Sequence, residues 1–397
     1  MLKGKTVLVG VSGGIASYKM ANCVSMLLKL GAEVHVLMTE NACNFINPIT
    51  FETLTNNKCI VDTFDRNFQF HVAHVSLAKK ADVFLIAPAT ANVIGKLANG
   101  IADDMLTTTA LACRGQIIVA PAMNTAMYQN RIVQDNIEKL KHFGFKIVTP
   151  DSGYLACGDT GEGKMPSEEV LIEHVIQEIA YEKDMVGKKL IVSAGPTQEA
   201  LDPVRYITNH STGKMGYEIA KAATRRGAEV TLVSGKTNLK APMFVNTINI
   251  RSAQDMFEAF RDNFEDNDII IKAAAVADYR PKTVADNKIK KKDGDMVIEL
   301  DRTMDIIKYM GENRKEGQFI CGFSMETENM IENSKAKLIK KNIDMIIANN
   351  LKQSGAGFGT DTNVVTIITR EEEKQLEIMT KEEVANRILD EIMAKMK

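Results

Sequence analysis

One pattern occurs twice in this chain: an apolar run, a turn, an amphipathic helix pattern, and then the tetrapeptide GAEV at the start of a second apolar run. The first copy spans residues 5–38 and the second spans residues 188–234. Two apolar runs joined by a helix are typical of a β-α-β unit with parallel strands. Because parallel sheets are covered by helices on both faces, the two copies predict two α/β domains.

The rest of the chain continues this alternation of strands and helices. Its 397 residues exceed the size at which one hydrophobic core usually stops growing. Further predicted strands are 83–87, 116–120 and 145–149 in the first half, and 268–275, 319–324 and 344–349 in the second. A hairpin at 364–379 is expected beyond the main sheet of the second half. We therefore expect two Rossmann-like, three-layer α/β domains with mostly parallel sheets, over 1–184 and 185–397.

Charge and cysteine content exclude several classes of protein. The formal net charge of −2 leaves no overall field to attract nucleic acid or anionic lipid. The six cysteines include no C-x-x-C pair, which argues against zinc and is typical of a reducing compartment. No stretch approaches the roughly 18 continuous apolar residues of a membrane span. We expect a cytoplasmic protein that acts on small molecules, with no nucleic acid or membrane partner.

A glycine-rich turn follows the first predicted strand. The segment SGGIAS at 12–17 opens a helix, where free backbone N–H groups and the helix dipole favour a phosphate. The alternative is a tight turn that needs glycine for its conformation alone. A nicotinamide dinucleotide would require the fuller G-x-G-x-x-G fingerprint and an acidic residue ending the second strand, which ends instead at Met38 and Thr39. The pattern therefore favours a mononucleotide phosphate.

Two Pro-Ala turns follow later strands of the first half, PATAN at 88–92 and PAMN at 121–124. Together with SGGIASYK, AHVSLAKKAD (73–82) and ACGDTGEGKM (156–165), they resemble the flavin-dependent cysteine decarboxylases that act on phosphopantothenoylcysteine. The resemblance covers nearly all of residues 1–180 and implies a flavodoxin-like flavoprotein domain that binds FMN.

This resemblance assigns roles to individual residues. It implies that His74 is the active-site histidine, that Cys157 is the acid on a glycine-rich flap, and that Asn124 binds substrate together with Ala122 and Met123. The residues implied to bind FMN are Ser12, Gly13, Gly14, Ile15, Thr39, Pro88, Thr90 and Asn92. Taken alone, a single histidine is more often structural and a lone cysteine is more often buried and inert. His71, three residues before His74, is the alternative candidate for the active-site histidine.

Five segments of the second half resemble the phosphopantothenate–cysteine ligases, over essentially all of 186–397. They are SAGPT (193–197), TNHSTGKMG (208–216), AAAVADYRPK (273–282), NKIKKKDG (287–294) and GFSMET (322–327). STGKMG at a helix start suits a phosphate, although the Walker A spacing is absent. An amide does not form from a free carboxylate at neutral pH, so this resemblance implies activation by CTP with Mg²⁺, for which the sequence assigns no ligands.

The ligase resemblance also assigns residues. It implies that Asn209 stabilises the acyl-nucleotide and that Lys288 holds the triphosphate, with Lys290 as the alternative in the same lysine run. Without the preceding segment AAAVADYRP, this lysine run would be interpreted as a solvent-exposed charged loop. The residues implied to bind CTP are Asp278, Lys288, Phe323, Lys337 and Lys341.

Together the two resemblances imply two steps of coenzyme A biosynthesis. The ligase half would condense 4′-phosphopantothenate with cysteine, and the decarboxylase half would convert the product to 4′-phosphopantetheine. The families also imply a homo-oligomer with trimeric decarboxylase cores and dimeric ligase halves. The alternative is a non-catalytic, flavin-binding regulatory protein of the same fold, which would keep the phosphate turn but lose His74 and Cys157. An NAD-dependent oxidoreductase is disfavoured by the ends of the second strands, at Thr39 and at Ser234-Gly235.

Overall fold

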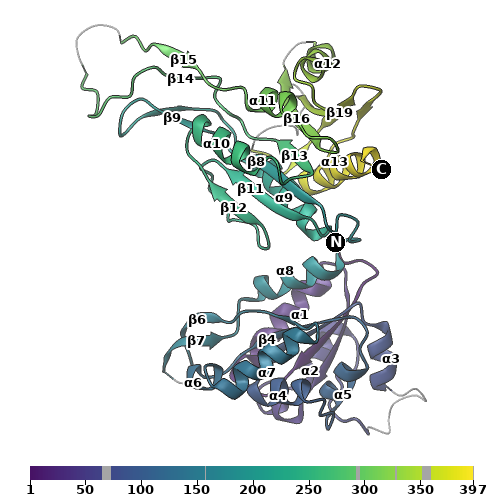
Figure 1. Cartoon of the computed structure of the whole chain (residues 1–397). Coiled ribbons are helices and arrows are strands. Elements are labelled where there is room, and N and C mark those ends of the chain that lie inside the picture. Colours follow the sequence, from purple (N-terminus) through teal and green to yellow (C-terminus); the bar gives the residue numbers. More distant parts are fainter. Residues whose placement is uncertain (65–72, 157, 292–295, 327–328, 351–358, 397) are drawn as a thin grey trace. The chain divides into compact units, whose positions relative to one another are not determined.

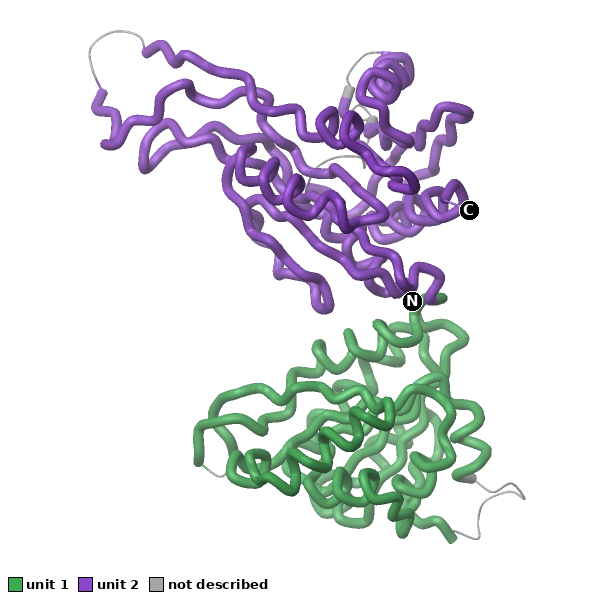
Figure 2. Tube along the Cα trace, viewed as in Figure 1, with its two compact units in different colours: residues 1–182 green, residues 183–397 purple. Residues whose placement is uncertain are grey.

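The structure is a computed structural model that describes residues 1–64, 73–156, 158–291, 296–326, 329–350 and 359–396. The chain divides into two compact units, residues 1–182 and 183–397, shown in different colours in Figure 2. Each unit has its own main sheet (Figure 1). Each also has its own hydrophobic core clusters, two in either unit among the described residues. The two units are described separately.

Unit 1 is built on a five-stranded parallel sheet with the order β2-β1-β3-β4-β5. The strands are β1 (Thr6–Val11), β2 (Glu33–Met38), β3 (Val83–Ala89), β4 (Gln116–Pro121) and β5 (Lys146–Ile147). This is the flavodoxin-like order, which confirms the fold expected for this half. The predicted strand at 145–149 is reduced to the two residues of β5.

Helices cover both faces of this sheet because β1 is apolar on both sides. Val7 and Val9 belong to a core with Leu27 and Leu171, whereas Leu8 packs with Ile94 into a second core on the opposite face. The helices are α1 (Met20–Lys29), α2 (Pro48–Thr55), α3 (Ala73–Lys80), α4 (Ala91–Ala98), α5 (Met105–Ala112), α6 (Thr125–Tyr128), α7 (Arg131–His142) and α8 (Glu168–Ile179), with 3₁₀ turns η1 (Ile15–Lys19) and η2 (Glu40–Asn44).

Unit 2 contains an eight-stranded sheet with the order β12-β11-β8-β13-β16-β17-β19-β20. Its strands are β8 (Lys189–Ala194), β11 (Glu229–Ser234), β12 (Asn246–Asn249), β13 (Ile269–Lys272), β16 (Phe319–Glu326), β17 (Met345–Asn350), β19 (Val365–Thr369) and β20 (Glu373–Gln375). The six parallel strands follow the Rossmann order 3-2-1-4-5-6. This confirms a Rossmann-like second half.

The hairpin predicted at 364–379 is part of the main sheet, not an addition beyond it. Its first strand, β19, pairs antiparallel with β17, and β20 then pairs with β19. The reason is burial: all five residues of β19 are buried, so the strand needs both a neighbour in the sheet and helices on its faces.

Five helices cover the two faces of the unit 2 sheet. They are α9 (Lys214–Arg225), α10 (Ala253–Asn263), α11 (Ile306–Glu312), α12 (Met330–Lys340) and α13 (Lys381–Lys395). One core contains residues of α9 and α13, and the other contains residues of α10, α11 and α12. No helix in the described ranges of the chain is long and apolar enough to cross a membrane.

Short antiparallel strands lie outside both main sheets. In unit 1 these are β6 (Asp151–Tyr154) and β7 (Thr160–Lys164), and in unit 2 they are β9 (Gln198–Ala200), β10 (Tyr206–Thr208), β14 (Tyr279–Pro281), β15 (Leu300–Arg302), β18 (Thr362–Asn363) and β21 (Met379–Thr380). Figure 1 shows β14 and β15 extending away from the unit 2 sheet, and we call residues 279–302 the arm.

A buried carboxylate attaches the arm to the β9–β10 turn. The Asp202 side chain is fully buried and accepts hydrogen bonds from the Val204 and Arg205 N–H groups, each 2.8 Å, and from the Ile289 N–H at 3.0 Å. The Arg205 guanidinium, 2.6 Å away, is the main reason that the pKa of Asp202 lies far below its usual range. These bonds fix the position of the arm segment around Ile289.

Gly216 brings helix α9 unusually close to strand β8. A Cβ atom at this position would lie 2.6 Å from both the Ser193 carbonyl oxygen and the Ala194 Cβ. We therefore expect Gly216→Ala to lower the free energy of unfolding of unit 2 by about 1–3 kcal/mol, because strand and helix must separate. Differential scanning calorimetry of the full chain measures the effect.

Gly95 provides the matched control, because it also lies within a helix. The nearest atom to a Cβ at Gly95 is the Asn136 Nδ2, 3.7 Å away, so Gly95→Ala should be neutral or stabilise unit 1 by roughly 0.5–1 kcal/mol. Equal melting of wild type and Gly216→Ala would contradict the tight helix–strand approach.

Candidate active sites

The carboxyl edge of the unit 1 sheet has a switch point between β1 and β3. The sheet order runs in opposite directions on either side of β1, so the loops that follow β1 and β3 diverge and leave a crevice. The segment SGGIAS follows β1 and PATAN ends β3, which places both sequence motifs at this crevice. Ligands of such sheets bind here.

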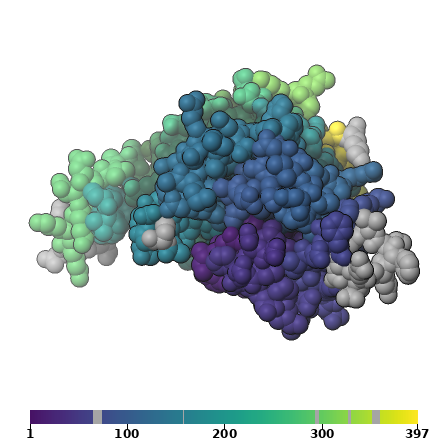
Figure 3. Space-filling model, turned by 90° about the horizontal axis from the view of Figure 1, so that it is seen from below, coloured from purple at the N-terminus to yellow at the C-terminus, as the bar shows by residue number. Residues whose placement is uncertain are grey.

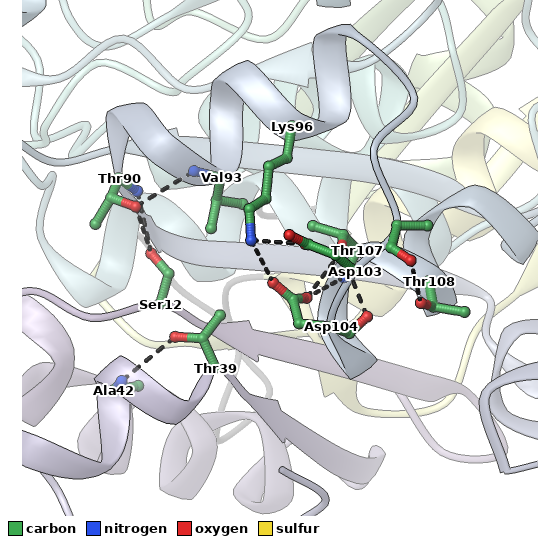
Figure 4. A network of polar contacts seen from close by, with 11 residues as sticks. Ser12, Thr39, Ala42, Thr90, Val93, Lys96, Asp103, Asp104, Thr107 and Thr108 are labelled. Carbon is green, nitrogen blue, oxygen red and sulfur yellow. Dashed lines mark hydrogen bonds and ion pairs between the residues drawn. The ribbon is translucent and has the colours of Figure 1, made fainter. Parts of the chain in front are cut away.

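Ser12 joins the two loops of this crevice (Figure 4). Its hydroxyl donates to the Pro88 carbonyl oxygen at 2.6 Å and accepts from the Thr90 N–H at 3.1 Å. The side chain is 1% exposed. Ser12 therefore sets the distance between the two loops, and its proton is already used in a protein hydrogen bond.

The two glycines of SGGIAS serve different purposes. A Cβ at Gly13 would lie 2.6 Å from the Asn41 Cβ, so only glycine fits against η2. A Cβ at Gly14 would meet only the Thr90 Cγ2, at 3.8 Å, and would project into the crevice. The N–H groups of Gly13, Gly14 and Ile15 have no acceptor among the residues that the structure describes. These backbone donors fit the phosphate of FMN.

The other predicted FMN residues surround the same crevice. Thr39 and Thr90 cap η2 and α4, accepting from the Ala42 N–H at 3.3 Å and the Val93 N–H at 3.4 Å. Asn92 is exposed in the first turn of α4. The peptide bond before Pro88 is cis. The structure thus brings all eight predicted residues, from Ser12 to Asn92, to the ends of β1, β2 and β3.

An ion-pair network joins α4 to the start of α5 near the crevice (Figure 4). The Lys96 ammonium lies 2.7 Å from the Asp103 carboxylate and 3.2 Å from that of Asp104. Asp104 also caps α5 by accepting from the Thr107 N–H at 2.8 Å. Lys96 is the main cause of the lowered pKa of Asp103. The network holds α4 and α5 together, and neither aspartate was among the predicted site residues.

The PAMN loop, which follows β4, forms hydrogen bonds both to the end of β3 and to the hairpin of β6 and β7. The Ala122 N–H donates to the Ala89 carbonyl oxygen, and the Met123 N–H donates to the Gly163 carbonyl oxygen on β7, both at 3.0 Å. A Cβ at Gly163 would lie 2.4 Å from the Met123 carbonyl oxygen, so β7 can approach this loop only with glycine. Ala122 and Met123 therefore join the substrate loop to the base of the hairpin.

Asn124 already binds a carboxylate. Its Nδ2 donates to Asp159 at 2.8 Å, while its Oδ1 caps α6 by accepting from the Ala126 N–H at 2.9 Å. Asp159 lies between the two strands of the hairpin. Cys157, two positions earlier in the sequence, lies outside the described residues.

His74 lies near the start of α3 and is partly buried. Helix α3 leads to the amino edge of the sheet, where Asp82 accepts from the Thr6 N–H at 2.7 Å, so its start points toward the carboxyl edge. Figure 3 shows the N-terminal residues of unit 1 (purple) next to blue residues from later in the same unit. The competing His71 lies outside the described residues.

The carboxyl edge of the unit 2 sheet contains a cavity of about 510 Å³. Five residues that the sequence analysis assigned to the ligase site line it: Asn209, Asp278, Phe323, Lys337 and Lys341. They come from separate loops and from α12, which the chain topology brings to one edge. The cavity lies at the switch point of the sheet, where the loops after β8 and β13 diverge.

The STGKMG segment forms the predicted helix start at this cavity. Gly213, with a φ of 80°, is the N-cap of α9, and no side chain among the described residues caps the helix. Gly213, Lys214 and Gly216 line the cavity, so the N–H groups of the first turn of α9 face it. Asn209 crosses to the opposite loop, where its Nδ2 donates to the Ala275 carbonyl oxygen at 3.1 Å.

Lys288 does not line this cavity in the single chain. It is exposed on the arm, next to Ile289, whose N–H donates to Asp202. The cavity instead contains three lysines that the sequence analysis did not assign, Lys214, Lys272 and Lys381. A signal existed for Lys272: it follows three isoleucines at the end of a central strand, where lysine is rarely found.

Comparison with known proteins identifies a family for each half of the chain. Residues 1–180 match the Flavoprotein family, and residues 185–396 match the DNA/pantothenate metabolism flavoprotein C-terminal domain. Coenzyme A biosynthesis bifunctional protein CoaBC of Bacillus subtilis is 48% identical over 398 residues, covering 99% of this chain and 98% of its own length. CoaBC of Escherichia coli is 40% identical over 397 residues, covering 99% and 98%.

Solved structures include similar chains for each unit. The crystal structure of the C-terminal domain of a CoaBC protein is 44% identical, covers 54% of this chain and 98% of its own, and has a TM-score of 0.47. The FMN-dependent cysteine decarboxylase SpaF is 33% identical, covers 44% of this chain and 99% of its own, and has a TM-score of 0.39. From its full-length relatives, this chain belongs to the family of bifunctional coenzyme A biosynthesis proteins.

Proposed function

We propose that unit 2 joins 4′-phosphopantothenate to cysteine with CTP and Mg²⁺, and that unit 1 then decarboxylates 4′-phosphopantothenoylcysteine to 4′-phosphopantetheine. The chain is a bifunctional enzyme of coenzyme A biosynthesis, with an FMN-dependent phosphopantothenoylcysteine decarboxylase and a phosphopantothenate–cysteine ligase. The observation that carries the proposal is that one chain has both switch-point sites, each with the motifs of its family.

The residues of unit 1 suit a decarboxylation. The chemistry that bound FMN supplies is the removal of two electrons from the cysteinyl group and their return after CO₂ has left. Asn124, which donates to the Asp159 carboxylate, has the geometry to donate to the carboxylate of a substrate. His74 would move protons in the first half of the reaction. Cys157 would protonate the product in the second half.

The residues of unit 2 suit the activation of a carboxylate. The free N–H groups at the start of α9 and the lysines of the cavity provide donors and positive charge for a triphosphate. Asn209 lies beside this helix start, where it would stabilise an acyl-cytidylate until cysteine attacks. Asp278, Phe323, Lys337 and Lys341 would bind CTP, and Lys288 would approach the triphosphate from the arm.

Oligomerisation and location are part of the same proposal. We expect a homo-oligomer with trimeric decarboxylase cores and paired ligase units. The arm supports pairing because it exposes large apolar side chains: Val297 is 88% exposed and Val284 is 56% exposed. We expect a cytoplasmic location, where the five cysteines that the structure describes would stay as free thiols.

Cys157→Ser should separate CO₂ release from reduction. A serine hydroxyl is a far weaker acid than a thiol, so CO₂ should still form while the unreduced enethiol product accumulates. Mass spectrometry of the products formed from 4′-phosphopantothenoylcysteine measures both. Normal formation of 4′-phosphopantetheine by this variant would remove Cys157 from the mechanism.

His74→Asn should retain FMN but release little CO₂, because asparagine keeps a polar side chain without a titratable group. Flavin absorbance of the purified variant and CO₂ release are measured on the same preparation. His71→Asn is the matched control and should stay active. The opposite pattern of activities would move the role to His71.

The ligase variants should leave decarboxylation intact. Lys288→Gln should slow pyrophosphate release by roughly tenfold to a hundredfold, because it loses a charge-assisted contact to the triphosphate. Asn209→Asp should still release pyrophosphate but form little amide, because a second negative charge beside the acyl phosphate repels it. Pyrophosphate, amide and CO₂ are measured in parallel.

Lys290→Gln is the matched control for Lys288→Gln and should behave as wild type. If Lys290→Gln slows pyrophosphate release instead, the lysine assignment is wrong. If either ligase variant abolishes CO₂ release from supplied 4′-phosphopantothenoylcysteine, the two sites do not act independently.

A further inference from the structure

Lys272 is the last residue of the central strand β13 and follows Ile269, Ile270 and Ile271. Side chains alternate between the faces of a strand, so Lys272 emerges on the same face as Ile270. Ile270 belongs to the core formed with α10, α11 and α12, whereas Ile269 and Ile271 belong to the core on the α9 and α13 side. The ammonium group of Lys272 therefore emerges toward α11 and α12.

Four other lysines line the ligase cavity, and each has a partner. Lys214 lies 2.8 Å from the Asp361 carboxylate, and Lys341 lies 3.0 Å from that of Asp305. Lys381 donates to a carbonyl oxygen, and Lys337 also has a polar interaction. Lys272 has no hydrogen-bond or ion-pair partner within the described ranges of the chain.

The lining of the ligase cavity is predominantly cationic, because its five lysines share the cavity with one carboxylate among the described residues, that of Asp278. Burial is the largest reason that the pKa of Lys272 is lowered to about 8, and the charge of Lys341 is the next. Asp305 at the start of α11 and Asp278 after β13 act in the opposite direction, and Lys337 lowers the pKa more weakly than either aspartate raises it. Lys272 itself has no ion-pair partner among the described residues, and a partly buried, unpaired positive charge is unfavourable, so an anion bound beside it would relieve that cost.

Two roles fit a lysine in this cavity, and the charges decide between them. A general base for the amino group of cysteine would have to draw an ammonium ion into a group of lysines, which is repulsive. A phosphate chain is attracted by the same group and by the start of α9 on the other side of the cavity. The surroundings therefore favour a phosphate contact.

We propose that Lys272 contacts the phosphate chain of the nucleoside triphosphate in the ligase cavity, a role that rests on the function proposed for unit 2. Lys272 at the end of β13 would then bind the phosphates in addition to Lys337 and Lys341, which lie on α12 and at its C-terminal end. The contact forms only in the nucleotide complex, which explains why Lys272 has no partner among the described protein groups.

The test is isothermal titration calorimetry of CTP with Mg²⁺ on the full-length holoenzyme. Lys272→Met should bind CTP about tenfold to a hundredfold more weakly than wild type, and CMP only slightly more weakly, since CMP lacks the extended phosphate chain. Lys335→Met is the matched control, because Lys335 lies on α12 outside the cavity, paired with Glu373. It removes the same charge and should bind CTP normally.

The pH dependence of CTP binding distinguishes a contact from a structural role. Lys272 is charged below its pKa of about 8, and an anion binds that form, so CTP affinity should fall as pH rises through this value. Between pH 7.5 and 9.5 the wild-type Kd should rise about tenfold, because the lysine loses its charge. Lys272→Arg stays charged over this range and should show no such rise.

Three results would overturn the proposal or its basis. If wild type binds CTP but Lys272→Met binds it equally well, the phosphate contact is wrong. If Lys272→Met binds CTP and releases pyrophosphate normally but fails to form the amide, Lys272 acts on cysteine instead. If wild type itself does not bind CTP, the function proposed for unit 2 fails first, which is a separate outcome.

Discussion

The reversal of strand order in each sheet is the constraint on which both sites depend. Parallel strands end at one edge, and the loops diverge only where the order reverses, at β1–β3 in unit 1 and β8–β13 in unit 2. In each unit polar side chains cross that gap. Ser12 donates to the Pro88 carbonyl oxygen in unit 1. In unit 2 Asn209 donates to the Ala275 carbonyl oxygen, and Ser193 and Thr197 accept from backbone N–H groups of the loop after β13. Hydrogen bonds therefore hold the two sides of each crevice at a defined distance.

The carboxyl edges of the two sheets carry different charges, which fits the different ligands proposed for the two units. Around the unit 1 crevice the donors are backbone N–H groups from Gly13 to Ile15, together with threonine hydroxyls, and its nearby Lys96 is neutralised by two aspartates. That arrangement suits one phosphate. The unit 2 cavity has five lysines and a helix start, which suits a chain of phosphates. The small net charge of the whole protein conceals this local contrast.

Sequence reasoning succeeded where a local rule determines the structure. The strands and first helices follow from apolar periodicity, and the glycines at 13, 213 and 216 are required by close approach or positive φ. The arm escaped prediction because β14 and β15 are three residues long and mostly exposed, so they carry no alternating pattern. Lys272 was missed because the predicted strand at 268–275 ran through it, whereas β13 ends at this residue. Only the placement of α12 in the structure shows that Lys272 lines the same cavity as Lys337 and Lys341.

The hairpin of unit 1 is restrained differently at its base and at its turn. Its base is fixed, because Met123 and Gly163 share a backbone hydrogen bond and only glycine fits there. Its turn is restrained by the 2.8 Å bond from Asn124 to the exposed Asp159 carboxylate and by the bond from the Leu155 N–H to the Asp159 carbonyl oxygen. In the proposed function, Asn124 would also donate to the carboxylate of the substrate, which its amide permits because the nitrogen carries two hydrogens. The proposed substrate contact would therefore adjoin the hydrogen bond that restrains this turn, while the base of the hairpin is fixed by backbone contacts.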